Sequence, residues 1–208
     1  MKIVAAAFGE TFAILFPIVD PIGNVSTFLA LTAGWASERR VGLIGRVVVF
    51  VVVGLSLFAI AGEPILHFFG ISLEALQIAG GLVVAYTGFK MMTASEEFIT
   101  QGANGEGGIA FAPLTIPLLA GPGAMAALLA LDSRDEDLAL SLIGTIAAII
   151  AIGACIYVAF RLGDRIARWM GPGGFIALTV VMGLILLAIG VELVVHGIVT
   201  HGAVVEGT

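Results

Sequence analysis

The feature that most constrains this chain is a series of six apolar runs, each about 20 residues long or longer. A transmembrane α-helix needs about 20 mostly apolar residues to cross the hydrocarbon core of a bilayer. Of the 208 residues, 60% are hydrophobic and 12% are charged, whereas soluble domains carry about 25% charged residues. These proportions exclude a water-soluble globular enzyme and a disordered tail. The predicted spans cover Ala5–Thr32, Val41–Ile60, Leu73–Met91, Ile109–Leu131, Leu138–Phe160 and Gly174–Val199.

The charged and metal-binding residue types exclude several further classes of protein. Nine Lys and Arg residues against 15 Asp and Glu residues give a net charge of −6, which repels the phosphate backbone of a nucleic acid. The single Cys155 excludes a disulfide scaffold and a cysteine-based zinc site. The three histidines lie apart, and no set of catalytic groups converges in the sequence. We therefore expect no metal, no cofactor and no enzymatic activity.

The positions of Lys and Arg predict the orientation in the plasma membrane, because basic residues concentrate in cytoplasmic loops. With six spans, the first, third and fifth loops share one side of the membrane, while the opposite side holds only Lys2 and Arg134. We predict that both termini lie on the non-cytoplasmic side and that Arg161–Trp169 forms a cytoplasmic interfacial turn. The basic residues on the cytoplasmic side are Arg39, Arg40, Arg46, Lys90, Arg161, Arg165 and Arg168.

A displacement of about 100 residues aligns the two halves of the chain. Because each half contains three spans, an odd number, the second copy enters the membrane in the opposite direction. The prediction is one transmembrane domain over residues 1–208, with repeats over about 5–92 and 109–199 and a flexible loop over about 93–108. Inverted repeats are common in secondary transporters, which bind substrate near the bilayer midplane between the halves. The aligned pairs include Pro17 with Pro117, Gly23 with Gly123, Gly81 with Gly183, and Gly88 with Gly190.

Matching Pro/Gly segments, Asp20–Asn24 and Ala120–Gly123, interrupt the first and fourth spans. Proline removes a backbone donor and clashes with the preceding turn, so each span is expected to kink or unwind. Each break creates the N-terminus of a second half-helix, whose unpaired amides favour an anion. Asp20 adds an ionisable group at mid-membrane depth, which by default marks a functional site. The alternative is that Asp20 is a protonated helix cap beside the kink.

These features predict a site for a small zwitterion, with half-helix ends for its carboxylate and an acid for its ammonium group or for a coupling cation. Asp20 is the residue predicted to bind a coupling ion. Glu192 and His196, four residues apart in the last span, form either a proton relay with Glu10 or an ordinary interfacial pair. The predicted substrate-binding residues are Asp20, Pro21, Gly23, Asn24, Thr27, Gly121, Pro122 and Gly123.

Several short stretches along the chain together form a family pattern. They include Leu15–Pro21, Phe28–Thr32, Phe69–Ser72, Ile78–Gly81, Gly88–Met91, Ile109–Pro117, Ala120–Gly123, Met182–Leu184 and His196–Ile198. In these stretches and their order the chain resembles the MarC family of membrane proteins, also called the small neutral amino acid transporter family, within the LysE exporter superfamily. The resemblance implies uptake of alanine-like or glycine-like amino acids with a cation gradient.

The sequence departs from the usual family pattern at three positions. Asp20 stands where the family commonly has Asn, and Gln77 and Val180 stand where it commonly has Arg. The loss of two cations and the gain of an acid change the electrostatics expected of the cavity, so neither substrate nor coupling ion transfers directly from the family.

The resulting hypothesis is an all-α membrane protein of six transmembrane helices in two inverted three-helix repeats. It is a secondary transporter of small neutral amino acids that works by alternating access and is coupled to protons or sodium. The alternatives are an exporter of small metabolites or amino acids with the same fold, or a channel. Glycine-rich helix faces also permit a homo-oligomer in the bilayer.

Overall fold

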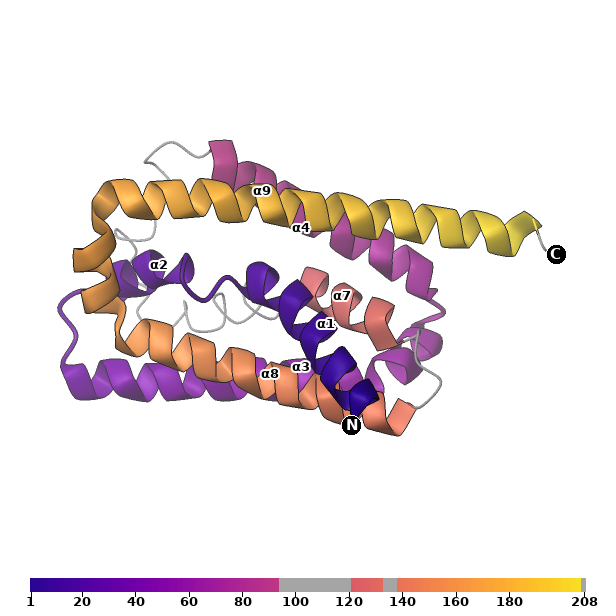
Figure 1. Cartoon of the computed structure of the whole chain (residues 1–208), viewed down its shortest axis with the longest axis horizontal. Helices are drawn as coiled ribbons and strands as arrows, with labels where there is room; N and C mark the ends of the chain where they lie inside the picture. Colours follow the sequence, from indigo (N-terminus) through magenta and orange to yellow (C-terminus); the bar gives the residue numbers. More distant parts are fainter. Residues whose placement is uncertain (94–120, 133–137, 207–208) are drawn as a thin grey trace.

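A computed structural model describes residues 1–93, 121–132 and 138–206, and within these ranges the chain is all-helical with no strand. The predicted all-α class is therefore confirmed for the described residues. Figure 1 shows the arrangement of the helices. Their bounds are α1 (Lys2–Val19), α2 (Asn24–Leu31), α3 (Ser37–Phe69), α4 (Leu73–Thr93), α7 (Pro122–Asp132), α8 (Leu138–Arg161) and α9 (Gly163–Glu206).

Five of the described helices are long and apolar enough to cross a membrane: α1, α3, α4, α8 and the Gly173–His201 part of α9. The predicted first span is interrupted after Val19, and α2 continues from Asn24. The predicted fourth span, Ile109–Leu131, begins outside the described residues, and only its end is seen, as α7. The six-span arrangement therefore stays a prediction.

Two helix boundaries differ from the predicted spans for a simple physical reason. The second span was predicted over Val41–Ile60, but α3 extends from Ser37 to Phe69. Charged residues end an apolar run without ending the backbone hydrogen bonds of a helix. For the same reason Arg161–Trp169, predicted as an interfacial turn, is helical from Gly163 onward, and Gly171 (φ 63°, ψ 177°) separates this short helix from the long remainder of α9.

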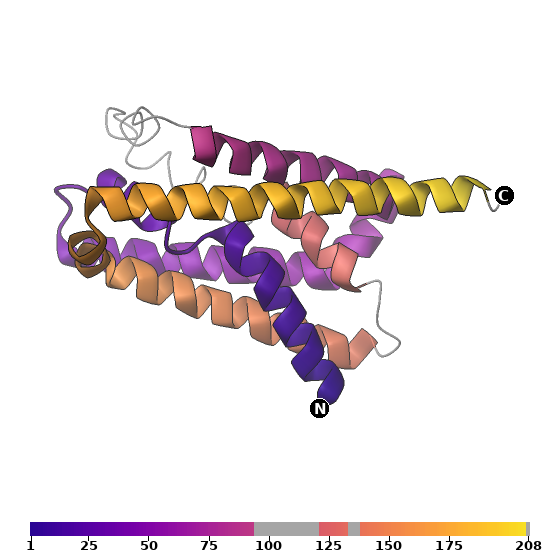
Figure 2. The same ribbon diagram turned by 45° about the horizontal axis from the view of Figure 1, so that its top comes forward.

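The helices pack as two pairs with shorter helices between them. Helices α3 and α8 lie side by side and run in opposite directions, and α4 and α9 form a second antiparallel pair (Figures 1 and 2). Helices α2 and α7 lie between these pairs, while α1 runs obliquely from one end towards the middle (Figure 2). The core includes Leu15 of α1, Val51 of α3 and Ile152 of α8, each fully buried.

Glycines allow α4 and α9 to approach each other closely. A Cβ placed on Gly81 would lie 2.7 Å from the carbonyl oxygen of Gly190, and a Cβ on Gly183 would lie 2.8 Å from that of Gly88. No larger residue fits such a backbone contact without displacing the helices. Small residues at these positions are typical of membrane helices, which associate by close van der Waals packing.

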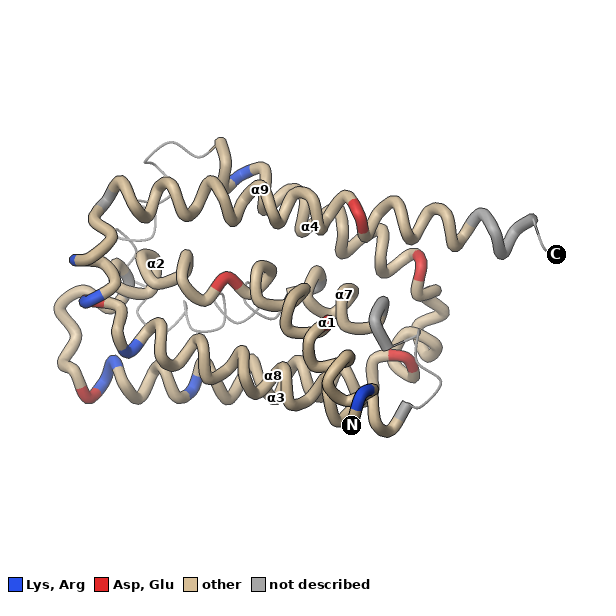
Figure 3. Tube along the Cα trace, viewed as in Figure 1, with Lys and Arg blue, Asp and Glu red and all other residues tan. Residues whose placement is uncertain are grey.

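Charged residues separate towards the two ends of the bundle. Basic residues gather where α3 begins and where α8 meets α9, whereas acidic residues predominate where α3 ends and α4 begins (Figure 3). At the basic end, Arg40 Nη1 donates to Asp164 Oδ2 at 3.0 Å and Nη2 donates to the carbonyl oxygen of Thr32 at 3.2 Å. Arg40 therefore joins the end of α2 and the start of α3 to the start of α9.

Candidate functional site

The break between α1 and α2 is the candidate site, and it lies near mid-length of the bundle (Figure 1). Asp20, which ends α1, has φ 42° and ψ 66°, in the left-handed region that non-glycine residues seldom adopt. Its backbone N–H donates to the carbonyl oxygen of Phe16. The helix resumes at Asn24, so the predicted break in the first span is confirmed at the predicted residues.

Polar side chains of the break satisfy backbone groups that the interruption leaves unpaired. The Asn24 side-chain amide donates to the carbonyl oxygens of Val19 and Asp20, each at 3.0 Å. The carboxylate oxygen Oδ1 of Asp20 accepts from the backbone N–H of Gly23, also at 3.0 Å. In a bilayer such pairing is required, because no water is present to hydrogen-bond free backbone groups. The side chains of two predicted site residues, Asp20 and Asn24, therefore hold the break in a defined conformation.

The carboxylate of Asp20 is enclosed by its own loop. The residue is 4% exposed, and Pro21 beside it is also buried. Its second oxygen, Oδ2, accepts no hydrogen bond from the described residues, and it lies so close to Gly23 that a Cβ at that position would overlap it. Only glycine, which has no Cβ, leaves space at position 23 for the carboxylate of Asp20. Oδ2 is therefore the carboxylate oxygen that no described residue engages in a hydrogen bond.

The second predicted break is seen only in part. Gly121 precedes α7 and has no regular secondary structure, and Pro122 is the first residue of that helix. Pro122 stands at the start of the helix, where its missing N–H costs no hydrogen bond. Gly123 packs against Val84 of α4, whose side chain a Cβ at position 123 would overlap. Ala120 lies outside the described residues.

The two half-helices begin in the interior of the bundle and run in opposite directions from there (Figure 1). Val25 and Phe28 of α2 and Ala124 and Leu128 of α7 belong to the same buried core. No hydrogen bond between described residues joins Asp20 to Gly121, Pro122 or Gly123. Thr27, the remaining predicted site residue, is partly buried in α2. The structure thus unites Asp20, Gly23 and Asn24 through hydrogen bonds and leaves the second set on the neighbouring half-helix.

The three departures from the family pattern have different surroundings. Asp20 closes the break described above. Gln77 is 2% exposed and faces α9, where its Oε1 lies 3.2 Å from Nδ1 of His196. Val180 is 40% exposed on the surface of α9. Sequence analysis singled out Gln77 and His196 separately but missed the contact between them, because the sequence does not indicate which face of α4 meets α9.

The chemical groups that the break provides are the carboxylate of Asp20 and the N-terminus of α2. No group of three His, Cys, Asp or Glu residues that could hold a metal occurs in the described ranges. The backbone N–H groups of Asn24 and Val25 at the start of α2 donate to the carbonyl oxygens of Asp20 and Ile22, so the helix N-terminus contributes the partial positive charge of its dipole rather than free donors. Asp20 supplies the opposite charge in the same break. This arrangement can bind a group with both charges, or a cation, without forming a covalent bond.

Comparison with known proteins gives a consistent result along the chain. The family described as "MarC family integral membrane protein" matches residues 5–201. A UPF0056 membrane protein of Pyrococcus abyssi is 32% identical over 200 residues, covering 91% of this chain and 94% of the relative. A UPF0056 membrane protein of Methanocaldococcus jannaschii is 33% identical over 192 residues, covering 90% and 93%.

A third relative carries the family name itself. The UPF0056 inner membrane protein MarC of Citrobacter koseri is 30% identical over 213 residues, covering 92% of this chain and 94% of the relative. No solved structure matches the fold. The family match over nearly the whole chain, the relatives and the apolar helices agree with one another: the chain belongs to the MarC family of integral membrane proteins.

Proposed function

We propose that the protein is a secondary transporter of small neutral amino acids that resemble alanine or glycine. The observation that carries this proposal is the break at Asp20–Asn24, where a buried acid and a half-helix N-terminus lie together near mid-length of the bundle. Broken helices in membranes persist where they line protein or a water-filled cavity, and in transporters they form substrate sites.

The charges of the break match those of a zwitterion. The partial positive charge at the start of α2 would attract the substrate carboxylate, and Oδ2 of Asp20 would accept from its ammonium group or bind a proton or sodium ion. Asp20 is 4% exposed, which favours a small side chain on a substrate that reaches its carboxylate. Gly121, Pro122 and Gly123 would complete the site from the second half of the protein.

The glycine contacts between α4 and α9 support two inverted repeats. The sequence alignment relates Gly81 to Gly183 and Gly88 to Gly190. In the structure Gly81 contacts Gly190, which is the repeat partner of Gly88. Reciprocally, Gly88 contacts Gly183, which is the repeat partner of Gly81. This reciprocal pattern is typical of a two-fold axis between two copies. Rocking of one repeat against the other about such an axis would give alternating access.

The separation of charge supports an orientation. The end rich in arginine would face the cytoplasm by the positive-inside rule, which places both termini on the other side of the membrane. The relatives named as inner membrane proteins support the plasma membrane as the location. Labelling of single cysteines introduced near each terminus by a membrane-impermeant reagent in intact cells tests this orientation.

Counterflow in proteoliposomes tests the function. Vesicles containing the purified protein are preloaded with unlabelled alanine, glycine, serine or leucine, and the uptake of labelled alanine is followed. We expect transient accumulation with the small amino acids and none with leucine. Absence of exchange with every amino acid, for protein shown to be folded, would contradict the proposed substrate.

Two other functions fit the same fold. An exporter would show counterflow but net efflux when a proton or sodium gradient is applied, so the direction of net flux separates it from an importer. A channel would give flux that rises linearly with substrate concentration and would show no counterflow. The buried carboxylate and the enclosed break favour a site that binds substrate over an open channel.

A further inference from the structure

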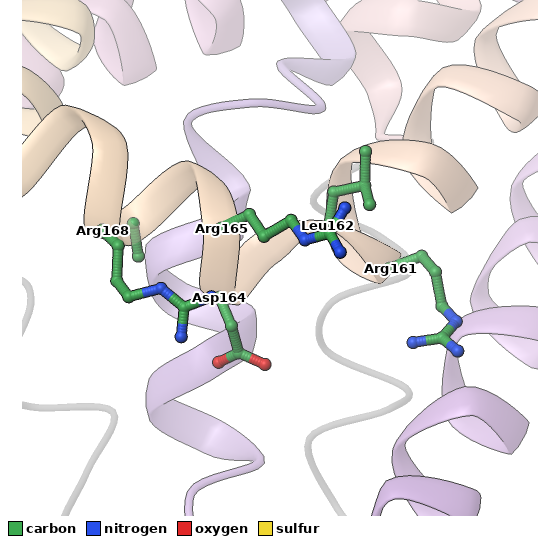
Figure 4. Close-up of a pocket in the computed structure, with 6 residues that line it drawn as sticks. Arg161, Leu162, Asp164, Arg165 and Arg168 are labelled. Carbon is green, nitrogen blue, oxygen red and sulfur yellow. The ribbon is translucent and has the colours of Figure 1, made fainter.

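The corner between α8 and α9 holds an open cavity of about 750 Å³, and three of its six lining residues are arginines (Figure 4). Arg168 extends on one side of Asp164 in this view and Arg161 on the other, with Arg165 near Leu162. The cavity lies at the basic end of the bundle, away from the break in the first span. Its lining residues are Arg161, Leu162, Asp164, Arg165, Ala167 and Arg168.

The cavity has a surplus of positive charge that the described residues do not neutralise. Asp164 is the acid of this corner, and its Oδ2 already accepts from Arg40 at 3.0 Å. No ion pair or hydrogen bond to a side chain in the described ranges engages the guanidinium groups of Arg161, Arg165 and Arg168. All three residues are exposed. The cavity therefore presents three guanidinium groups whose charge a bound anion would balance.

The position of the cavity along the helices indicates the source of the anion. The part of α8 that is long and apolar enough to cross a membrane ends at Arg161, and that of α9 begins at Gly173. Residues 162–172 would therefore lie at the level where the hydrocarbon core gives way to lipid headgroups. Trp169 in this segment is 89% exposed, and tryptophan is enriched at that boundary. A ligand here meets headgroups before it meets the hydrocarbon or the bulk solvent.

We propose that this cavity binds the phosphate group of an anionic phospholipid headgroup. The planar guanidinium donates two parallel N–H groups to phosphate oxygens, which makes arginine the preferred partner of this group. Basic pockets between membrane helices bind phosphate-bearing headgroups in the same way. Leu162 and Ala167 supply the apolar wall that the start of the acyl chains would contact. The site lies apart from the Asp20 break and does not depend on transport.

Lipid binding to the purified full-length protein in detergent tests the proposal. The probes are phosphatidylglycerol, zwitterionic phosphatidylcholine and inorganic phosphate, and bound lipid is counted by native mass spectrometry across a concentration series. The main variant is R161Q/R165Q/R168Q, and R161K/R165K/R168K retains the charge without the fork of donors. The matched control is Arg46→Gln, which removes an exposed arginine from the same end of the bundle but outside the cavity.

We expect wild-type protein to bind phosphatidylglycerol more tightly than phosphatidylcholine, and the triple Gln variant to lose about tenfold or more of that affinity. The affinity of the triple Lys variant for phosphatidylglycerol should lie between those of the wild type and the triple Gln variant, and Arg46→Gln should bind like wild type. Equal loss in Arg46→Gln would overturn the site in favour of diffuse surface charge. Unchanged binding by the triple Gln variant would overturn it as well. Competition by millimolar inorganic phosphate as effective as by the lipid would overturn the lipid as the source.

Discussion

Nδ1 of His196 in α9 lies 3.2 Å from Oε1 of Gln77 in α4, so the ring N–H of His196 donates to the side-chain oxygen of Gln77. Gln77 is 2% exposed. Thr200, one turn later in α9, lies 3.5 Å from the same ring nitrogen. A Cβ on Gly197, the residue after His196, would lie 2.9 Å from the carbonyl oxygen of Glu74, so the backbones of α4 and α9 approach closely beside this polar cluster. The α4–α9 pair thus combines close backbone packing with a part-buried polar contact between side chains.

The contact between Gln77 and His196 should appear as a coupling energy. We expect a double-mutant cycle of Gln77→Leu and His196→Leu to give about 0.6 kcal/mol, the average for hydrogen bonds between membrane helices, with about 1.7 kcal/mol as the upper bound. The measurement is unfolding in mixed micelles. Thr87→Ala replaces Gln77→Leu in the control cycle, because Thr87 Oγ1 bonds to Val83 of its own helix. A coupling as small as the control's would contradict the interhelical contact.

The glycine contact should make α9 intolerant of even one methyl group. A Cβ at Gly190 would lie 2.6 Å from the carbonyl oxygen of Gly81, a backbone atom that cannot rotate away. We expect Gly190→Ala to lower the free energy of unfolding by about 1–3 kcal/mol, the usual cost of overpacking.

Gly54→Ala is the matched control for this prediction. A Cβ at Gly54 in α3 meets nothing within 4 Å, so the variant should be neutral or more stable by up to about 1 kcal/mol through helix propensity. If both variants unfold alike in the same micelles, the close packing of α4 and α9 is not what limits stability.

The side chain of Asn24 should contribute more to stability than its neighbours in the break. Asn24→Ala removes the donors to two carbonyl oxygens, at Val19 and Asp20. The Asp20 carbonyl still accepts from the Asn24 backbone N–H in this variant, whereas the Val19 carbonyl loses its side-chain donor. A carbonyl left unpaired away from water costs about 1–3 kcal/mol, so we expect a loss of that size in unfolding experiments.

Ser26→Ala provides the comparison for Asn24. Ser26 Oγ donates to one carbonyl oxygen, that of Gly23, so the loss should be clearly smaller. A larger loss for Ser26→Ala than for Asn24→Ala would show that the break is not held by the Asn24 amide.

The carboxylate of Asp20 should serve transport more than folding. Asp20→Asn keeps an oxygen that can accept from the Gly23 N–H, as Oδ1 does now, and removes the charge. We expect helical content and unfolding to change little, while transport driven by a proton or sodium gradient is lost. Normal gradient-driven uptake by Asp20→Asn would contradict the coupling role, although counterflow could still support the substrate.

The sequence was sufficient to predict the elements that depend on local properties. Apolar runs predict the five helices that are long and apolar enough to cross a membrane, because a span follows from length and hydrophobicity. The Pro/Gly segment after Val19 predicts the break, because proline and a nearby glycine disfavour a continuous helix whatever surrounds the segment. Among the residues predicted for the site, Asp20, Gly23 and Asn24 are the ones that hydrogen bonds unite, and they are within five residues of one another.

Tertiary structure alone decided which faces meet. The sequence placed Gly81 and Gly190 in corresponding spans, but only packing put their backbones in contact. Gln77 was notable for its residue type, and its burial against His196 depended on the rotation of α4 about its axis. Likewise, Arg40 and Asp164 are 124 residues apart and form an ion pair because α3 and α9 begin at the same end of the bundle. Local propensity acts within a few residues, whereas these contacts depend on how whole helices turn and cross, which the six apolar runs leave open.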